Sequence, residues 1–121
     1  MKLQLQNDSL RVRIDEAELA ALQSGESLTL ALGDPARPLF SMQLRLGGEP
    51  ALQTDAVAWQ LLLPSAAVAD YVQTLPNRHA LELSVHVDGH ALAVQFEVDV
   101  RDSLQVRGAR RRGEQASSAS S

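Results

Sequence analysis

The stretch that most limits the fold is residues 81–100, where apolar and polar residues alternate on both sides of Asp88-Gly89. Alternation with period two is typical of a β-strand with one buried face, and Asp-Gly is a preferred pair for a two-residue type I′ turn. We therefore predict a β-hairpin in which Leu83 lies opposite Val94. Its large apolar side chains all fall on one face, so the hairpin needs a covering layer.

The first part of the chain predicts another hairpin, followed by a helix. Alternation predicts two short paired strands within residues 2–14. Asp15 and Glu18 have the spacing of a capping box, and Gly25 is a typical residue just past a helix end. We expect a helix over residues 16–24.

The remaining alternation completes the expected fold. Residues 28–32 and 40–46 predict a hairpin, residues 57–63 a strand, and residues 65–75 a second helix. The order strand, helix, hairpin thus occurs twice at nearly constant spacing, although Leu-rich strands can also align by chance. We predict an α+β fold of two βαββ pseudo-repeats, which form one curved antiparallel sheet or an open barrel with two covering helices. The residues expected to be nearly fully buried are Leu30, Trp59, Leu61, Leu83, Val94 and Phe96.

Length and charge divide the chain of 121 residues into two parts. We expect a single domain over residues 1–103, and a disordered tail over residues 104–121 because Arg, Gly and Ser bury too little apolar area. Residues 1–100 carry a net charge of −7 and residues 101–121 a net charge of +3. An acidic domain is repelled by phosphate, so nucleic acid is an improbable partner, except weakly through Arg110, Arg111 and Arg112 in the tail.

The composition also bears on location and chemistry. The chain has no cysteine, which excludes disulfides and thiolate catalysis and fits a reducing compartment. It begins without the apolar core of a signal peptide and has no run long enough to span a membrane. We expect a cytoplasmic protein that does not bind a membrane.

The N-terminal sequence resembles a known group of proteins. Met1-Lys2-Leu3-Gln4-Leu5, then Ser9 to Ile14, then Glu18 to Leu22 are similar to the start of an uncharacterised family of small bacterial single-domain proteins, a domain of unknown function. Glu97-Val98-Asp99 resembles the end of that family's last strand. The resemblance implies a domain boundary and a bacterial cytoplasmic setting, and it implies no activity.

No catalytic, metal or cofactor site is predicted. The histidines do not share one face, and the serines and glycines lack hydrolase and phosphate-binding motifs. The most distinctive surface feature is a set of charged residues on the outward faces of strands: Arg11, Arg13, Arg45, Glu82, Glu97 and Asp99.

These charges leave several functions open. They can neutralise one another across adjacent strands, bind an anionic partner, or join two copies of the chain. Our first hypothesis is a non-catalytic binding or protein-interaction module. The alternatives are a small enzyme that uses Arg11, Arg13, Glu97 and Asp99, and polyanion binding through the Arg-rich tail.

Overall fold

The computed structural model describes residues 1–100, which form eight strands and two helices. In chain order the elements are β1 (Lys2–Leu5), β2 (Ser9–Asp15), α1 (Glu16–Gln23), β3 (Leu28–Asp34), β4 (Arg37–Gly47), β5 (Ala51–Asp55), β6 (Ala58–Pro64), α2 (Ser65–Gln73), β7 (Leu81–Val87) and β8 (His90–Asp99). The expected Arg-rich tail lies outside the described residues.

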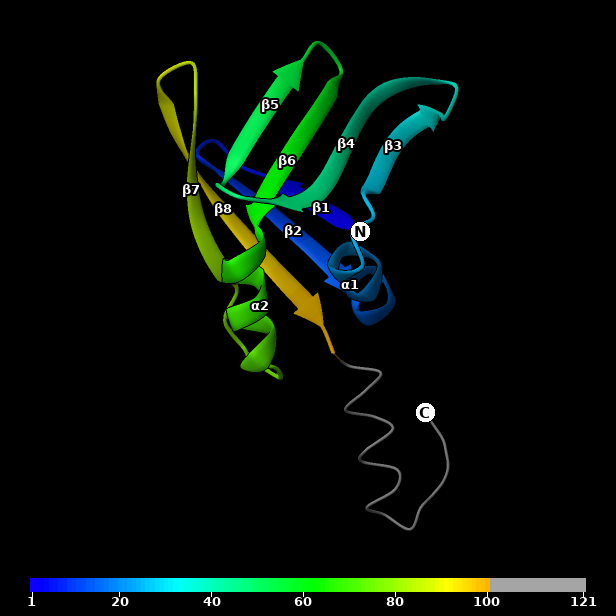
Figure 1. Cartoon of the computed structure of the whole chain (residues 1–121). Coiled ribbons are helices and arrows are strands. Elements are labelled where there is room, and N and C mark those ends of the chain that lie inside the picture. Colours follow the sequence, from blue (N-terminus) through cyan, green and yellow to red (C-terminus); the bar gives the residue numbers. More distant parts are fainter. Residues whose placement is uncertain (101–121) are drawn as a thin grey trace.

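The strands form two four-stranded sheets (Figure 1). Sheet A has the order β1-β2-β8-β7, and sheet B has the order β3-β4-β6-β5. In each sheet the outer pairs are antiparallel, while the central pair, β2 with β8 or β4 with β6, is parallel. The prediction of one antiparallel sheet or an open barrel is therefore wrong, because the chain forms two separate mixed sheets and neither closes.

The hairpins themselves agree with the sequence. Leu3 pairs with Val12 in sheet A, and Leu83 pairs with Val94. The β7–β8 turn has φ values of 53° at Asp88 and 79° at Gly89, as a type I′ turn requires. Local turn chemistry and alternation thus determine each hairpin, but they carry no signal for how one hairpin joins another.

The element order β-β-α-β-β occurs twice along the chain. Each half contributes its first hairpin to one sheet and its second hairpin to the other, so both sheets contain strands from both halves. Strand β5, which precedes the expected strand at residues 57–63, is an element that the sequence did not predict. The duplication of one ancestral unit stays a prediction.

The capping box of α1 is confirmed. The Asp15 carboxylate accepts a hydrogen bond from the Glu18 backbone N–H at 2.7 Å, and the Glu18 carboxylate accepts one from the Asp15 backbone N–H at 3.0 Å. Gly25 follows with φ +99°, a conformation that favours glycine. These contacts start and end the helix where the sequence indicates.

The core lies between the inner faces of the two sheets and under the helices. Helix α1 contacts both sheets, and α2 contacts β6 and β7. Both helices lie at one end of the sheets, and the hairpin turns point toward the other (Figure 1). Within residues 1–100, neither helix is long and apolar enough to cross a membrane. The fully buried side chains include Val12, Met42, Leu44, Leu61, Leu63, Val68, Val94 and Phe96.

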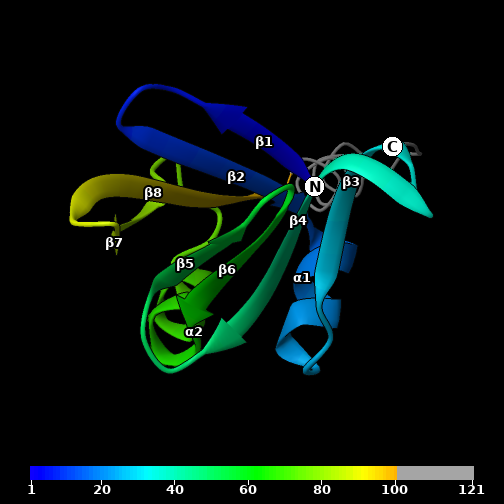
Figure 2. The same cartoon turned by 90° about the horizontal axis from the view of Figure 1, so that it is seen from above.

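Three residues of the predicted core are only partly buried: Leu30, Leu83 and Trp59. Leu30 and Leu83 lie on the edge strands β3 and β7, which have a neighbour on one side only. Trp59 lies near the start of β6, toward the end of the sheets that is away from both helices, which we call the helix-free end. Seen from above, the strands of the two sheets run at an angle to each other (Figure 2).

Candidate binding surface

The parallel pairing of β2 with β8 brings residues from opposite ends of the sequence together. In its register Arg11 lies beside Gln95, and Arg13 lies beside Glu97. The residues between them, such as Val12, are buried, so alternation directs the charged side chains to the outer face of sheet A. We call Arg11, Arg13, Gln95, Glu97 and Asp99 the charged strip.

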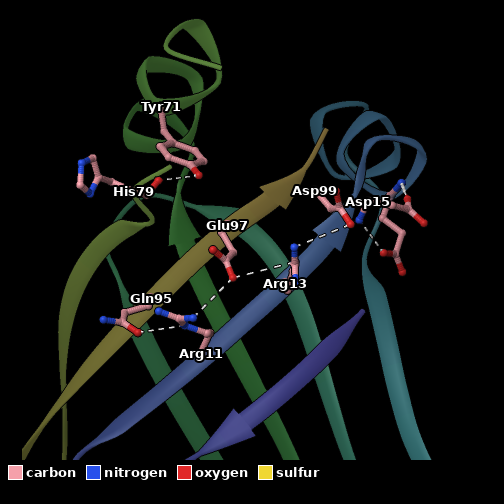
Figure 3. A network of polar contacts seen from close by, with 9 residues as sticks. Arg11, Arg13, Asp15, Tyr71, His79, Gln95, Glu97 and Asp99 are labelled. Carbon is pink, nitrogen blue, oxygen red and sulfur yellow. Dashed lines mark hydrogen bonds and ion pairs between the residues drawn. The ribbon is translucent and has the colours of Figure 1, made fainter. Parts of the chain in front are cut away.

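The side chains of the charged strip form a ladder (Figure 3). Arg11 Nε donates a hydrogen bond to Gln95 Oε1 at 3.1 Å, and Arg11 Nη1 lies 3.7 Å from Glu97 Oε1. Arg13 Nε lies 4.0 Å from the same Glu97 oxygen, and Arg13 Nη2 lies 3.8 Å from Asp99 Oδ2. Glu97 therefore lies between two guanidinium groups, and each arginine faces two acceptor side chains.

These ion pairs are loose. The three contacts with carboxylates, at 3.7–4.0 Å, are longer than a good charge-assisted hydrogen bond of about 2.7–2.9 Å. The Arg11 and Arg13 side chains remain 45% and 43% exposed, and that of Glu97 remains 23% exposed. Such pairs contribute at most about 1 kcal/mol each to stability. The guanidinium groups are thus within reach of another anionic group as well as of their own neighbours.

The outer face around the charged strip is shallowly hollowed. Two of its depressions, with volumes of about 270 and 220 Å³, share Gln4 and Arg11 in their lining. Lys2, Arg13 and Glu97 also line the larger one, and Ser9 borders the smaller. Both are smaller than the roughly 300–1,000 Å³ of a usual small-molecule site. The surface resembles an open sheet face more than an enclosed active site.

The structure brings four of the six predicted site residues into contact and leaves two apart. Arg11, Arg13, Glu97 and Asp99 form the ladder, but Arg45 lies on β4 in the other sheet, where its Nη2 donates to Gln60 Oε1 at 3.4 Å. Arg45 therefore lies on a different sheet from the other two arginines. The alternation of side chains along a strand tells which residues face outward. Only the order of the strands tells which sheet they belong to.

Glu82 lies on the edge strand β7 of sheet A, opposite Gln95. Its side chain shares the outer face with the charged strip but lies one strand farther from the arginines.

Three polar residues of this surface were not among the predicted site residues. Gln95 accepts a hydrogen bond from Arg11, and Lys2 and Gln4 on β1 line the larger depression. Their alternation in the sequence indicates that they face outward. Lys2 and Gln4 lie next to Arg13 and Arg11 because β1 pairs with β2 in the same register as the predicted hairpin.

A second polar contact lies on the helix side of β8. The Tyr71 hydroxyl donates a hydrogen bond to the His79 carbonyl oxygen at 3.0 Å (Figure 3). The Tyr71 ring packs edge-on against Phe96, with ring centroids 6.1 Å apart, and the residue is 7% exposed. This contact ties α2 to the segment that leads into β7.

Burial raises the pKa of the Tyr71 hydroxyl above its usual value, the backbone hydrogen bond of Val98 lowers it in part, and the nearby Glu97 charge raises it further. Because Tyr71 is the single tyrosine of the chain, phenolate absorbance reports on it alone. We expect its titration midpoint to lie above about 10 in the folded protein and near 10 in denaturant.

The raised pKa of Tyr71 also affects stability. As pH rises through about 10, the unfolded chain loses its tyrosine proton before the folded chain does, so the free energy of unfolding falls with rising pH. A Tyr71→Phe variant should lack this part of the alkaline loss, whereas a folded-state midpoint at or below 10 would contradict the expected burial effect.

Among residues 1–100, no group of three or more His, Asp or Glu side chains is arranged to hold a metal ion. His90 lies near Asp8, with 3.6 Å between Nε2 and Oδ1, in an exposed contact between two hairpin turns. A scan against models of protein families finds no match to this chain, and a search of curated proteins finds none either.

Proposed function

We propose that this domain is a non-catalytic module that binds another protein through the outer face of sheet A. The observation that carries the proposal is the charged strip, in which charges of both signs lie side by side on an open surface. An enzyme that used Arg11, Arg13, Glu97 and Asp99 would need an enclosed site around reacting atoms. The shallow depressions favour binding over catalysis.

The loose geometry of the ladder supports the same conclusion. Each guanidinium group has five N–H donors in a planar fork. Arg11 makes one hydrogen bond within the ladder, to Gln95, and its approach to Glu97 is too long for another. A partner carboxylate can therefore bind these arginines without first breaking a strong internal pair.

The partner that fits this surface also carries both signs of charge. Its acidic groups would lie over Arg11 and Arg13, and its basic groups over Glu97 and Asp99. Such complementarity between alternating charges fixes register and rejects wrong partners more than it adds affinity. We therefore expect a selective interaction of moderate strength.

Site-specific photo-crosslinking in cells of the source organism tests the proposal. A photoreactive residue at Gln4, on the outer face of sheet A, should yield a discrete product whose mass exceeds that of two copies of the chain. The same residue at Gln53, which is exposed on the outer face of sheet B, is the matched control. We expect the product from Gln4 and not from Gln53.

A double variant, Arg11→Ala with Arg13→Ala, should remove most of the crosslinked product, because it deletes the cationic half of the ladder. Arg45→Ala, which removes an exposed arginine from the other sheet, should leave the product unchanged. Equal products from Gln4 and Gln53, or a product insensitive to the double variant, would contradict the proposed surface.

A further inference from the structure

The positive side chains of this acidic domain are concentrated in one place. Residues 1–100 contain six Lys and Arg residues against thirteen Asp and Glu residues. Three of the six, Lys2, Arg11 and Arg13, line the larger depression on the outer face of sheet A, which we call the cationic depression. The β1–β2 pairing brings them together, because Lys2 lies opposite Arg13 and Gln4 lies opposite Arg11. Half of the positive side chains of residues 1–100 therefore surround a single depression.

The lining of the cationic depression carries a net positive charge. Glu97 is the one acidic residue in this lining, so three positive charges face one negative charge. Its carboxylate lies 3.7 Å from Arg11 and 4.0 Å from Arg13 (Figure 3). Within residues 1–100, the exposed Lys2 side chain forms no ion pair. A net charge of +2 is thus left on side chains that solvent, or a ligand, can reach.

A third depression, lined in part by α1, has the opposite character. Its volume is about 240 Å³, and it shares Lys2 and Arg13 with the cationic depression. Asp15, Glu18 and Asp99 add three carboxylates to its lining. An anion placed there would lie among more negative than positive side chains. The attraction for an anion is therefore local to the cationic depression.

We infer that the cationic depression binds the phosphate group of a phosphate monoester. Such a group carries a charge of about −1.5 to −2 at pH 7 and three acceptor oxygens, which match the net charge of +2 and the three positive side chains. A carboxylate, with one charge and two oxygens, leaves part of this charge uncompensated.

The net charge of −7 on residues 1–100 acts differently on a single phosphate and on a nucleic acid. At physiological salt, charges farther away than about 8 Å are largely screened, so a single phosphate in the depression interacts mainly with the side chains that line it. A nucleic acid backbone extends beyond the depression and meets the acidic surroundings. A phosphate monoester is thus a better match than a polyanion.

The smaller depression fits the remainder of such a ligand. It shares Gln4 and Arg11 with the cationic depression, and Gln6, Ser9 and Gln95 complete its lining. Amide and hydroxyl side chains donate and accept hydrogen bonds. They suit the hydroxyl groups of a small phosphate ester, and equally the peptide groups beside a phosphorylated side chain of a protein. The two sources share the phosphate ester, and binding of suitable probes distinguishes them.

NMR titration of the full chain with glycerol 3-phosphate tests the inference. Backbone amide signals of β1 and β2 should shift, with a dissociation constant at least about tenfold lower than for acetate at the same pH and ionic strength. Signals of residues 101–121 report any binding to the other arginines of the chain. Equal affinities for the two anions, or shifts confined to residues outside sheet A, would overturn the inference.

Three substitutions separate this site from a general effect of charge. Lys2→Gln should weaken phosphate binding by about threefold or more, the size expected for one exposed charge contact. Arg45→Gln removes the same charge from the other sheet and should leave binding unchanged. Glu97→Gln should tighten binding by about threefold or more, because it removes the one carboxylate that lines the depression. Weaker binding by Glu97→Gln, or equal effects of the other two substitutions, would contradict the site.

A second titration, with a blocked Gly-phosphoserine-Gly peptide, identifies the source of the phosphate. Tighter binding of the peptide than of glycerol 3-phosphate would assign the site to a phosphorylated protein, and the reverse would assign it to a free ester; both results support a phosphate site. The inference does not depend on the protein partner proposed above. Phosphate binding without a crosslinked product from Gln4 would contradict that partner alone, whereas a product without phosphate binding would contradict the phosphate site alone.

Discussion

Replacing Phe96 with alanine should lower the free energy of unfolding by about 3–5 kcal/mol. Phe96 is fully buried on β8, a central strand that pairs with β2 on one side and β7 on the other. Its loss removes apolar burial and the edge-on contact with Tyr71, and the surrounding strands cannot close the cavity without losing their register. Urea denaturation at a fixed protein concentration measures the change.

Phe40→Ala is the matched control for this experiment. Phe40 is the other phenylalanine of the chain and is only partly buried, near the helix-free end of sheet B. We expect its replacement to lower the free energy of unfolding by less than about 2 kcal/mol, because the Phe40 side chain buries less apolar surface on folding than Phe96 does. A loss below 1 kcal/mol for Phe96→Ala would mean that the faces of the β7–β8 hairpin are inverted.

Leu61→Ala should be nearly as damaging, with a loss of about 2–5 kcal/mol in the free energy of unfolding. Leu61 is fully buried on β6, at the centre of sheet B, where it pairs with Leu44. The next residue, Leu62, pairs with Arg45 on the outer face of the same strand. Leu62→Ala should therefore cost clearly less, and thermal or urea denaturation of the two variants compares neighbouring positions of one strand.

This pair of leucines tests alternation more sharply than a comparison between distant sites. The two variants share the chemistry and the strand, so they differ mainly in which face they occupy. If Leu62→Ala proved more damaging than Leu61→Ala, β6 would be shifted by one residue against its neighbours.

The local elements could be predicted because their signals lie within a few residues. The Asp88-Gly89 turn fixes a hairpin register, and the Asp15 and Glu18 capping box fixes a helix start. The sequence could not predict the parallel pairs, since Leu10 lies beside Val94 across most of the described chain. Pairing at such a distance depends on how whole hairpins pack and leaves no local pattern. Strand β5 was missed because Ala51–Asp55 contains a single large apolar residue.

The candidate surface could likewise be predicted only in part: the outward faces follow from the sequence, but the order of the strands does not. Alternation shows that Arg11, Arg13, Glu97 and Asp99 face outward, and the β2–β8 pairing then turns these separate positions into one strip. The same alternation shows that Arg45 faces outward, yet strand order places it on the other sheet. The exposure of Leu32 was not predicted, because its position in an alternating strand indicates burial, whereas it lies near the tip of the β3–β4 hairpin, which projects from the rest of the structure (Figure 1).

Sheet A is built from the two ends of the described chain, and sheet B from the segment between them. This order of strands also affects the protein while it is being synthesised. All four strands of sheet B come from the continuous segment 28–64, so they can pair soon after that segment leaves the ribosome. Sheet A lacks its central strand β8 until residues 90–99 emerge, so one edge of β2 has no neighbouring strand until then. During that interval we expect the N-terminal hairpin to be open to strand pairing with other nascent chains.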